Sequence, residues 1–183
     1  IWRPGDPGVR ASAVVRVGNS AAAYAEVGDI CRRLGELDRA EAAFARAQEI
    51  QGGPCGALSL LRLAQGRVDE AMSIATECVA GQSNRLGRAA LLPLLVHVAI
   101  AAGDLDASER ALAELEGTVA EFDTPSLRAT ERSTRGRLQL ARQDRSARDT
   151  LQQAVDAWRK LDVPYEEATA RTLLGQAFRE AGD

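Results

Sequence analysis

Aromatic residues make up only 4% of this 183-residue sequence, and histidine and methionine occur once each. So few aromatics disfavour a β-sandwich, which is rich in aromatic and β-branched residues. A lone histidine, His97 within an apolar run, gives no basis for a Ser-His-Asp device or a zinc site. No GxxxxGK[ST] string is present, so no phosphate loop is expected. The sequence therefore predicts a protein that is not an enzyme, with no catalytic residue, cofactor or metal.

A surplus of positive charge is also lacking, because the net charge is -3. Domains that hold DNA by its phosphates usually carry a basic surplus, so we expect no direct contact with nucleic acid. The longest apolar run, Leu91 to Ala102, is too short for a bilayer span and includes Pro93. No signal peptide is recognised, and Cys31, Cys55 and Cys78 have no CxxC spacing. These features predict a cytoplasmic protein without membrane contact whose cysteines are small, buried and reduced.

The sequence does contain abundant alanine and a recurring turn signal. Glycine followed by a short polar or apolar stretch occurs at Gly35, Gly66, Gly103 and Gly182, and Gln143 has the same flanks. Successive signals are 31, 37, 40 and 39 residues apart, close to the period of about 34 residues in tetratricopeptide repeats. Glycine can take the left-handed conformation that ends a helix, so each signal predicts the turn of a helical hairpin.

Small residues recur at fixed distances from these turns. Seven residues before the turn stands a glycine in three units, and we expect Gly28 and Gly175 to lie at tight helix contacts. Five residues after the turn, two units have an alanine. Nine residues after the turn, we expect a residue that fills the groove between hairpins. The predicted structural positions are Gly28, Gly35, Ala40, Phe44, Gly66, Ala71, Gly103, Leu112, Gly136, Gly175, Phe178 and Gly182.

The first unit reads Tyr24-xx-Val27-Gly28-xx-Cys31-xxx-Gly35-xxxx-Ala40-xxx-Phe44-xx-Ala47. It resembles the tetratricopeptide consensus, and Leu174-Gly175-xx-Phe178-xxx-Gly182 resembles the first half of that consensus. The intermediate units depart from it, with Ser59 and Val96 in place of the small glycine. The resemblance implies an all-α fold, a right-handed superhelical stack of antiparallel helix hairpins. About four and a half units would fill residues 21–183, and residues 1–20 would be an irregular flank or the remnant of a preceding repeat.

Helical periodicity and breakers define the expected elements. A short helix is possible at 9–17, and Pro93 is expected to kink its helix or mark its start. The last helix is expected to leave an apolar stripe, including Leu174 and Phe178, partly uncovered. From residue 21 onward the expected helices are 21–34, 38–50, 56–65, 69–80, 86–102, 106–122, 126–142, 146–161 and 164–181.

A narrower resemblance concerns the strings at 60–66, 124–129 and 164–171. These are similar to the repeat region of large bacterial regulators that carry an ATPase domain before the repeats and a LuxR-type helix-turn-helix after them. The resemblance implies a sensor or interaction module whose concave surface holds a protein, a peptide or a small-molecule inducer. A free-standing adaptor that only brings proteins together is the alternative, and the flanking sequence would distinguish the two.

One charged pattern adds a candidate binding site. Arg128, Arg132 and Arg135 are spaced to share one helix face, and Arg142 continues that face two turns on. Arginine forks bind phosphates and carboxylates through two parallel hydrogen bonds. The stripe is therefore either a solvated outer face or a patch that binds a phosphate, a nucleotide or an acidic partner segment.

Overall fold

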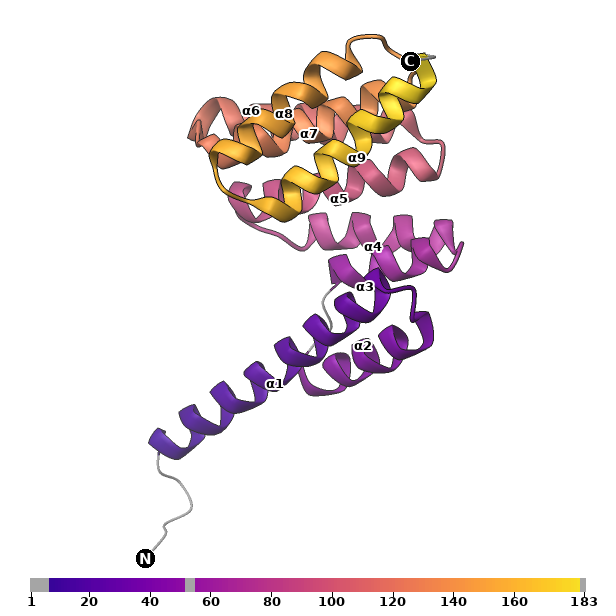
Figure 1. The fold of residues 1–183 in the computed structure, drawn as a ribbon. Helices are drawn as coiled ribbons and strands as arrows, with labels where there is room; N and C mark the ends of the chain where they lie inside the picture. Colours follow the sequence, from indigo (N-terminus) through magenta and orange to yellow (C-terminus); the bar gives the residue numbers. More distant parts are fainter. Residues whose placement is uncertain (1–6, 52–54, 182–183) are drawn as a thin grey trace, which may run out of the picture. The chain divides into compact units, whose positions relative to one another are not determined.

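The computed structural model describes the backbone of residues 7–51 and 55–181, and the side chains of 20–50 and 55–180. Within these ranges every regular element is an α-helix (Figure 1). The all-α fold of tetratricopeptide-like hairpins is thereby confirmed. The helices are α1 (Pro7–Arg33), α2 (Leu37–Gln51), α3 (Cys55–Ala64), α4 (Val68–Ala80), α5 (Arg85–Ala101), α6 (Leu105–Phe122), α7 (Pro125–Ala141), α8 (Ala147–Lys160) and α9 (Pro164–Ala181).

From α2 to α9 the predicted bounds agree with the structure to within one residue at each end. The first helix is different, because α1 begins at Pro7 and is continuous across the region expected to be irregular. Pro93 lies inside α5, which begins at Arg85, so the proline does not mark the start of that helix. The expected turn at Gly182 lies outside the described residues.

The recurring turn signal forms the same hydrogen-bonded helix end each time. Gly35, Gly66 and Gly103 have φ between 75° and 79°, the left-handed conformation predicted for them. In the first turn the amide of Gly35 donates to the carbonyl of Arg32, at 3.0 Å, and that of Glu36 to Cys31, at 2.9 Å. These two hydrogen bonds satisfy carbonyls that the helix itself leaves without partners.

Gln143 forms this turn without glycine. Its φ is 57°, and the amides of Gln143 and Asp144 bond back to Leu140 and Gln139, both at 2.9 Å. A residue with a Cβ pays a steric cost in this conformation, so the flanking sequence imposes the turn here. Flanks that match the glycine units were therefore a valid signal.

The chain divides into two compact units, residues 1–74 and 75–183. The core of the first unit forms where α1, α2 and α3 meet. Cys31 of α1, Ala40 and Phe44 of α2 and Leu61 of α3 are all at most 3% exposed. Phe44, at nine residues past the turn, is the largest of these side chains and fills the space between the helices. Burial of apolar area is the main stabilising contribution in such a unit.

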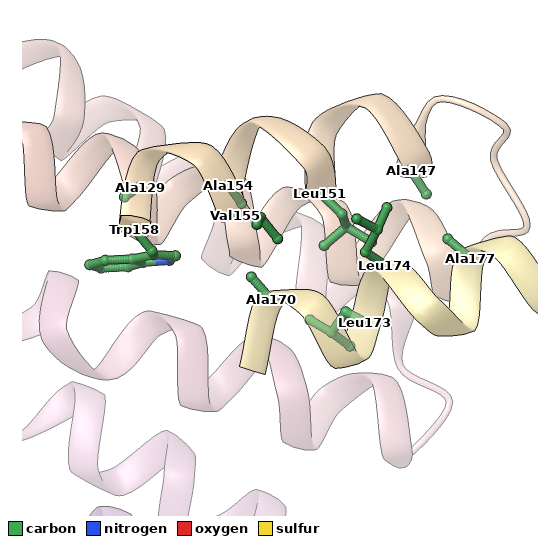
Figure 2. Packing of buried hydrophobic residues seen from close by; sticks show 10 residues of the cluster. All are labelled: Ala129, Ala147, Leu151, Ala154, Val155, Trp158, Ala170, Leu173, Leu174 and Ala177. Atoms are coloured by element: carbon green, nitrogen blue, oxygen red, sulfur yellow. The ribbon is translucent and has the colours of Figure 1, made fainter. Parts of the chain in front are cut away.

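The second unit has two clusters. Figure 2 shows one of them, in which side chains of α8 and α9 point toward one another. Leu151 is fully buried there, and Trp158 donates its indole N–H to the hydroxyl of Ser133 on α7, at 2.8 Å. The other cluster joins α5, α6 and α7 around Leu115, which is also fully buried.

The predicted small-residue contacts exist at two of the three glycines. A Cβ at Gly28 would lie 2.6 Å from Cε1 of Phe44, and one at Gly136 would lie 2.6 Å from Cγ of Leu151. Gly175 is exposed, and a Cβ there would meet no atom within 4 Å. The expected tight contact at Gly175 is therefore wrong. Gly28 and Gly136 each contact the helix that follows, and the structure describes no helix after α9.

In the hairpin of α3 and α4, which departs from the repeat consensus, Ser59 takes the place of the glycine. It is fully buried, and its hydroxyl donates to the carbonyl of Ala71 at 2.7 Å. Ala71 is the small residue five positions after the turn, and it is also fully buried. A hydrogen bond thus joins the two helices of this hairpin at the position where Gly28 and Gly136 make a close contact in theirs.

The expected open stripe on α9 is mostly absent. Leu174 is only 9% exposed and belongs to the cluster with α8, so that part of the prediction is wrong. Phe178 is 36% exposed, and the guanidinium of Arg148 lies 4.3 Å from the centroid of its ring. A cation over an aromatic face is itself a favourable contact. Helix α9 therefore uses its apolar side to bind α8.

The cysteines only partly follow the prediction. Cys31 is buried and free. Cys55 and Cys78 are disulfide-bonded, so the expectation of three reduced cysteines is wrong. Among the helices of the described residues, none is both long and apolar enough to cross a membrane.

Candidate functional site

Three large apolar side chains of helix α1 and one directly after it are open to solvent. Tyr24, Val27, Ile30 and Leu34 are 41%, 47%, 54% and 69% exposed. Their spacing of three or four residues places them along one side of the helix, and we call this set the α1 stripe. Contiguous exposed apolar surface of this kind marks interaction sites.

In α3 and α7, the matching position is covered by the helix that precedes each of them. Counted back from the turn residue, Leu61 of α3 and Leu138 of α7 correspond to Ile30. Leu61 is fully buried, in one cluster with Phe44 of α2. Leu138 is 4% exposed, in one cluster with Leu112 of α6. Ile30 has the same place in its repeat and remains open.

The position that corresponds to Leu34 gives the same result with polar side chains. Directly after α3 it is Gln65, whose amide nitrogen lies 2.9 Å from the carboxylate of Glu41 on α2. Directly after α7 it is Arg142, which forms an ion pair with Glu109 on α6. The face that α1 leaves open is therefore one that binds a neighbouring helix elsewhere in the chain.

The contact of α2 with α3 predicts that the stability of the fold depends on pH. Arg62 donates to Glu41 at 2.7 Å, and the bonds from Arg62 and then Gln65 lower the pKa of Glu41 from 4.5 to about 2. A carboxylate with a depressed folded pKa contributes stability that is complete above its unfolded pKa and is lost as the pH falls toward the folded value. We expect Glu41→Gln to lose less stability than wild type between about pH 5 and pH 2.

Urea unfolding at several pH values measures this difference. Glu49→Gln is the control, because Glu49 pairs with Arg46 on the exposed face of α2 and forms no hydrogen bond or ion pair with α3 among the described residues. Parallel pH curves for wild type and Glu41→Gln would contradict the assignment.

The four arginines predicted as one anionic-ligand patch fall into two groups. Arg135 and Arg142 line a hollow of about 320 Å³ between α6 and α7. Arg135 lies 3.0 Å from the carboxylate of Glu116, and Arg142 pairs with Glu109. These two arginines link α7 to α6 and have their charge balanced inside the protein.

Arg128 and Arg132 line a second hollow, between α7 and α8. Arg128 is paired with the exposed carboxylate of Asp123 just before its helix. Lys160 of α8 lines the same hollow. It is the single lysine of the chain, and sequence reasoning did not include it because it lies 28 residues beyond Arg132.

The α1 stripe was also missed, although Tyr24 and Val27 formed part of the repeat consensus. The signal was available, since large apolar residues recur with helical spacing at 24, 27, 30 and 34. The spacing alone does not distinguish core from open surface, because the residues that correspond to Ile30 in α3 and α7 are buried. The pattern shows which face is apolar, and only the structure shows what covers it.

Comparison with known proteins gives one match. A model described as tetratricopeptide repeat matches residues 21–54, which contain the end of α1 and all of α2. No curated protein and no solved structure gives a significant match. Among the described residues, no group of histidine, cysteine and acidic side chains is arranged to hold a metal ion. The matched repeat is of a kind that mediates contacts between proteins, and it contains the whole α1 stripe.

Proposed function

We propose that this protein is an interaction module that binds an amphipathic helix of a partner protein on the α1 stripe. The observation that carries the proposal is the exposure of Ile30, because α2 and α6 cover the corresponding residues of α3 and α7. Val27 and Leu34 extend this exposed surface along the same side. A helix is the occupant because helices occupy the matching faces of α3 and α7. Its own apolar residues would recur every three or four positions.

Selection from a library of displayed helical peptides tests this binding. The bait is the whole chain, and the comparison is a variant with Val27→Gln and Ile30→Gln. Both side chains are about half exposed, so the variant should keep its fold. We expect peptides with an apolar face that bind the wild type and lose at least about tenfold in affinity for the variant, as removal of apolar anchors costs more than 1.4 kcal/mol.

A control variant with Ala22→Gln changes an exposed position of α1 outside the stripe. It should bind the selected peptides as wild type does. Selected peptides that bind all three proteins equally, or a library that yields no helical binder, would contradict the proposal.

We further propose that the module belongs to the regulatory region of a multidomain transcriptional regulator, in the cytoplasm. The similarity of the strings at 60–66, 124–129 and 164–171 to such regulators supports this context. In that setting, partner or inducer binding would alter an ATPase domain and a helix-turn-helix domain by linkage between two states. Reading the complete gene tests it: a phosphate loop upstream and a helix-turn-helix downstream are expected, and a gene without both would favour the free-standing adaptor.

A further inference from the structure

The hollow between α7 and α8 has a volume of about 350 Å³, within the range of small-ligand sites. It lies in the second unit, at the end of the hairpin away from its turn, where α7 begins and α8 ends. Its lining combines cationic, polar and apolar side chains. These are Pro125, Arg128 and Arg132 at the start of α7, Gln153, Asp156, Ala157 and Lys160 of α8, and Leu161 directly after it.

The charges of this lining are unbalanced. Three cations face a single carboxylate, that of Asp156. Asp156 is already bonded outside the hollow, 3.2 Å from the amide of Gln152 and 3.3 Å from the guanidinium of Arg159. The hollow therefore has an excess of positive charge in a protein whose net charge is -3.

Two of the three cations have no counterion among the described residues. Arg128 bonds to the carboxylate of Asp123 and, at 3.0 Å, to its carbonyl oxygen. By contrast, the side chains of Arg132 and Lys160 form no ion pair and no hydrogen bond within the described part of the chain. The charge of Arg132 acts on buried Glu131, where it offsets part of the rise that burial causes in the pKa of that carboxyl. Its donors remain available to a ligand.

The backbone adds to this positive potential. Helix α7 begins at Pro125, so its amino-terminal partial charge lies at the edge of the hollow. Thr124 caps the amide of Leu127 at 3.2 Å, the amide of Arg128 donates to the carbonyl of Thr124 at 3.0 Å, and the amide of Ser126 is left without a helical partner. The side chains of Ala157 and Leu161 supply an apolar wall, against which the body of a small ligand could pack.

We propose that this hollow binds the phosphate group of a phosphate monoester. A phosphate monoester is close to dianionic at neutral pH, so it matches two cations without counterions, and arginine can bind it with two parallel bonds. A ligand with a single carboxylate would carry one negative charge and would leave one of these two cations unpaired. The proposal is independent of the peptide site on α1, which lies in the other unit and uses none of these residues.

Isothermal titration calorimetry with the whole chain tests it, with inorganic phosphate, adenosine monophosphate and a phosphoserine peptide as probes. The three probes separate free phosphate, a nucleotide and a modified protein as the source of the same group. We expect at least one to bind, with affinity that falls as salt rises, because exposed charges are screened over about 8 Å at physiological ionic strength. The test variant is Arg132→Gln with Lys160→Gln, in which affinity should fall about tenfold or more.

The control is Arg110→Gln with Arg145→Gln, which removes the same charge from exposed positions outside the hollow. Its affinity should stay within about twofold of wild type. Lys160→Arg should retain binding, because it keeps the charge. Equal losses in the test and control variants would show an effect of net charge only. Such equal losses would overturn the proposal. So would a failure of all three phosphate probes to bind, or binding of an unphosphorylated glutamate peptide with the same affinity as the phosphoserine peptide.

Discussion

Gly28→Leu is expected to lower the free energy of unfolding of the first unit by about 1–3 kcal/mol, because it overpacks a filled contact. Even a Cβ at this position would lie within 2.9 Å of three carbon atoms of the Phe44 ring. The ring is 1% exposed and cannot turn away into solvent. Chemical denaturation of wild type and variant measures the difference.

The same experiment includes its own rescue and control. A double variant with Gly28→Leu and Phe44→Ala should be less destabilised than the sum of the single changes, because the new side chain enters the space that the ring leaves. Gly175→Ala should be neutral or stabilising by up to about 1 kcal/mol, since nothing opposes its Cβ and alanine is the better helix former. Destabilisation by both glycine changes alike would show that the cost is not contact with Phe44.

Phe44→Ala alone is expected to cost about 3–5 kcal/mol, the largest effect of any single change considered for this protein. The side chain joins three helices in one cluster with Cys31 and Leu61, so its removal leaves a cavity that a short hairpin cannot easily close. Phe122→Ala is the matched control, because that ring is 39% exposed at the end of α6. Its cost should stay near 0.5 kcal/mol, the usual size for surface changes.

Thermal unfolding followed by circular dichroism can compare the two phenylalanine variants with wild type. Similar shifts in Tm for both would mean that the ring at 44 is not the central packing element of its unit. A loss of helical signal at low temperature in Phe44→Ala alone would agree with the account, since the stability of a small unit is only a few kcal/mol.

The helices could be predicted because their ends are encoded locally. A turn needs a residue that tolerates positive φ, a cap needs a short polar side chain, and each is visible within a few positions. Thr124 and Asp104 show this, since each side chain caps the helix that follows it. The unit with Gln143 was found from its flanks, which impose the turn that glycine makes in the others.

The surfaces could not be predicted in the same way, because they depend on which neighbour is present. Gly28 and Gly175 have the same place in the repeat, yet one meets a ring and the other meets nothing. Arg132 and Arg135 share a helix face, but Glu116 of α6 neutralises only the second. The partner of a residue comes from another helix, and a repeat period contains no information on which side chain stands there.

Site-specific photo-crosslinking in the cells of origin tests the central claim, that the α1 stripe binds a helix of another protein. A photoreactive residue is placed at Val27 in the stripe, and at Ala22 as an exposed control on another side of the same helix. The account predicts a product from position 27 that joins this chain to a second protein, through a segment with apolar residues every three or four positions. It predicts no such product from position 22. Products from both positions alike, or a crosslink from position 27 that stays within one polypeptide, would contradict it.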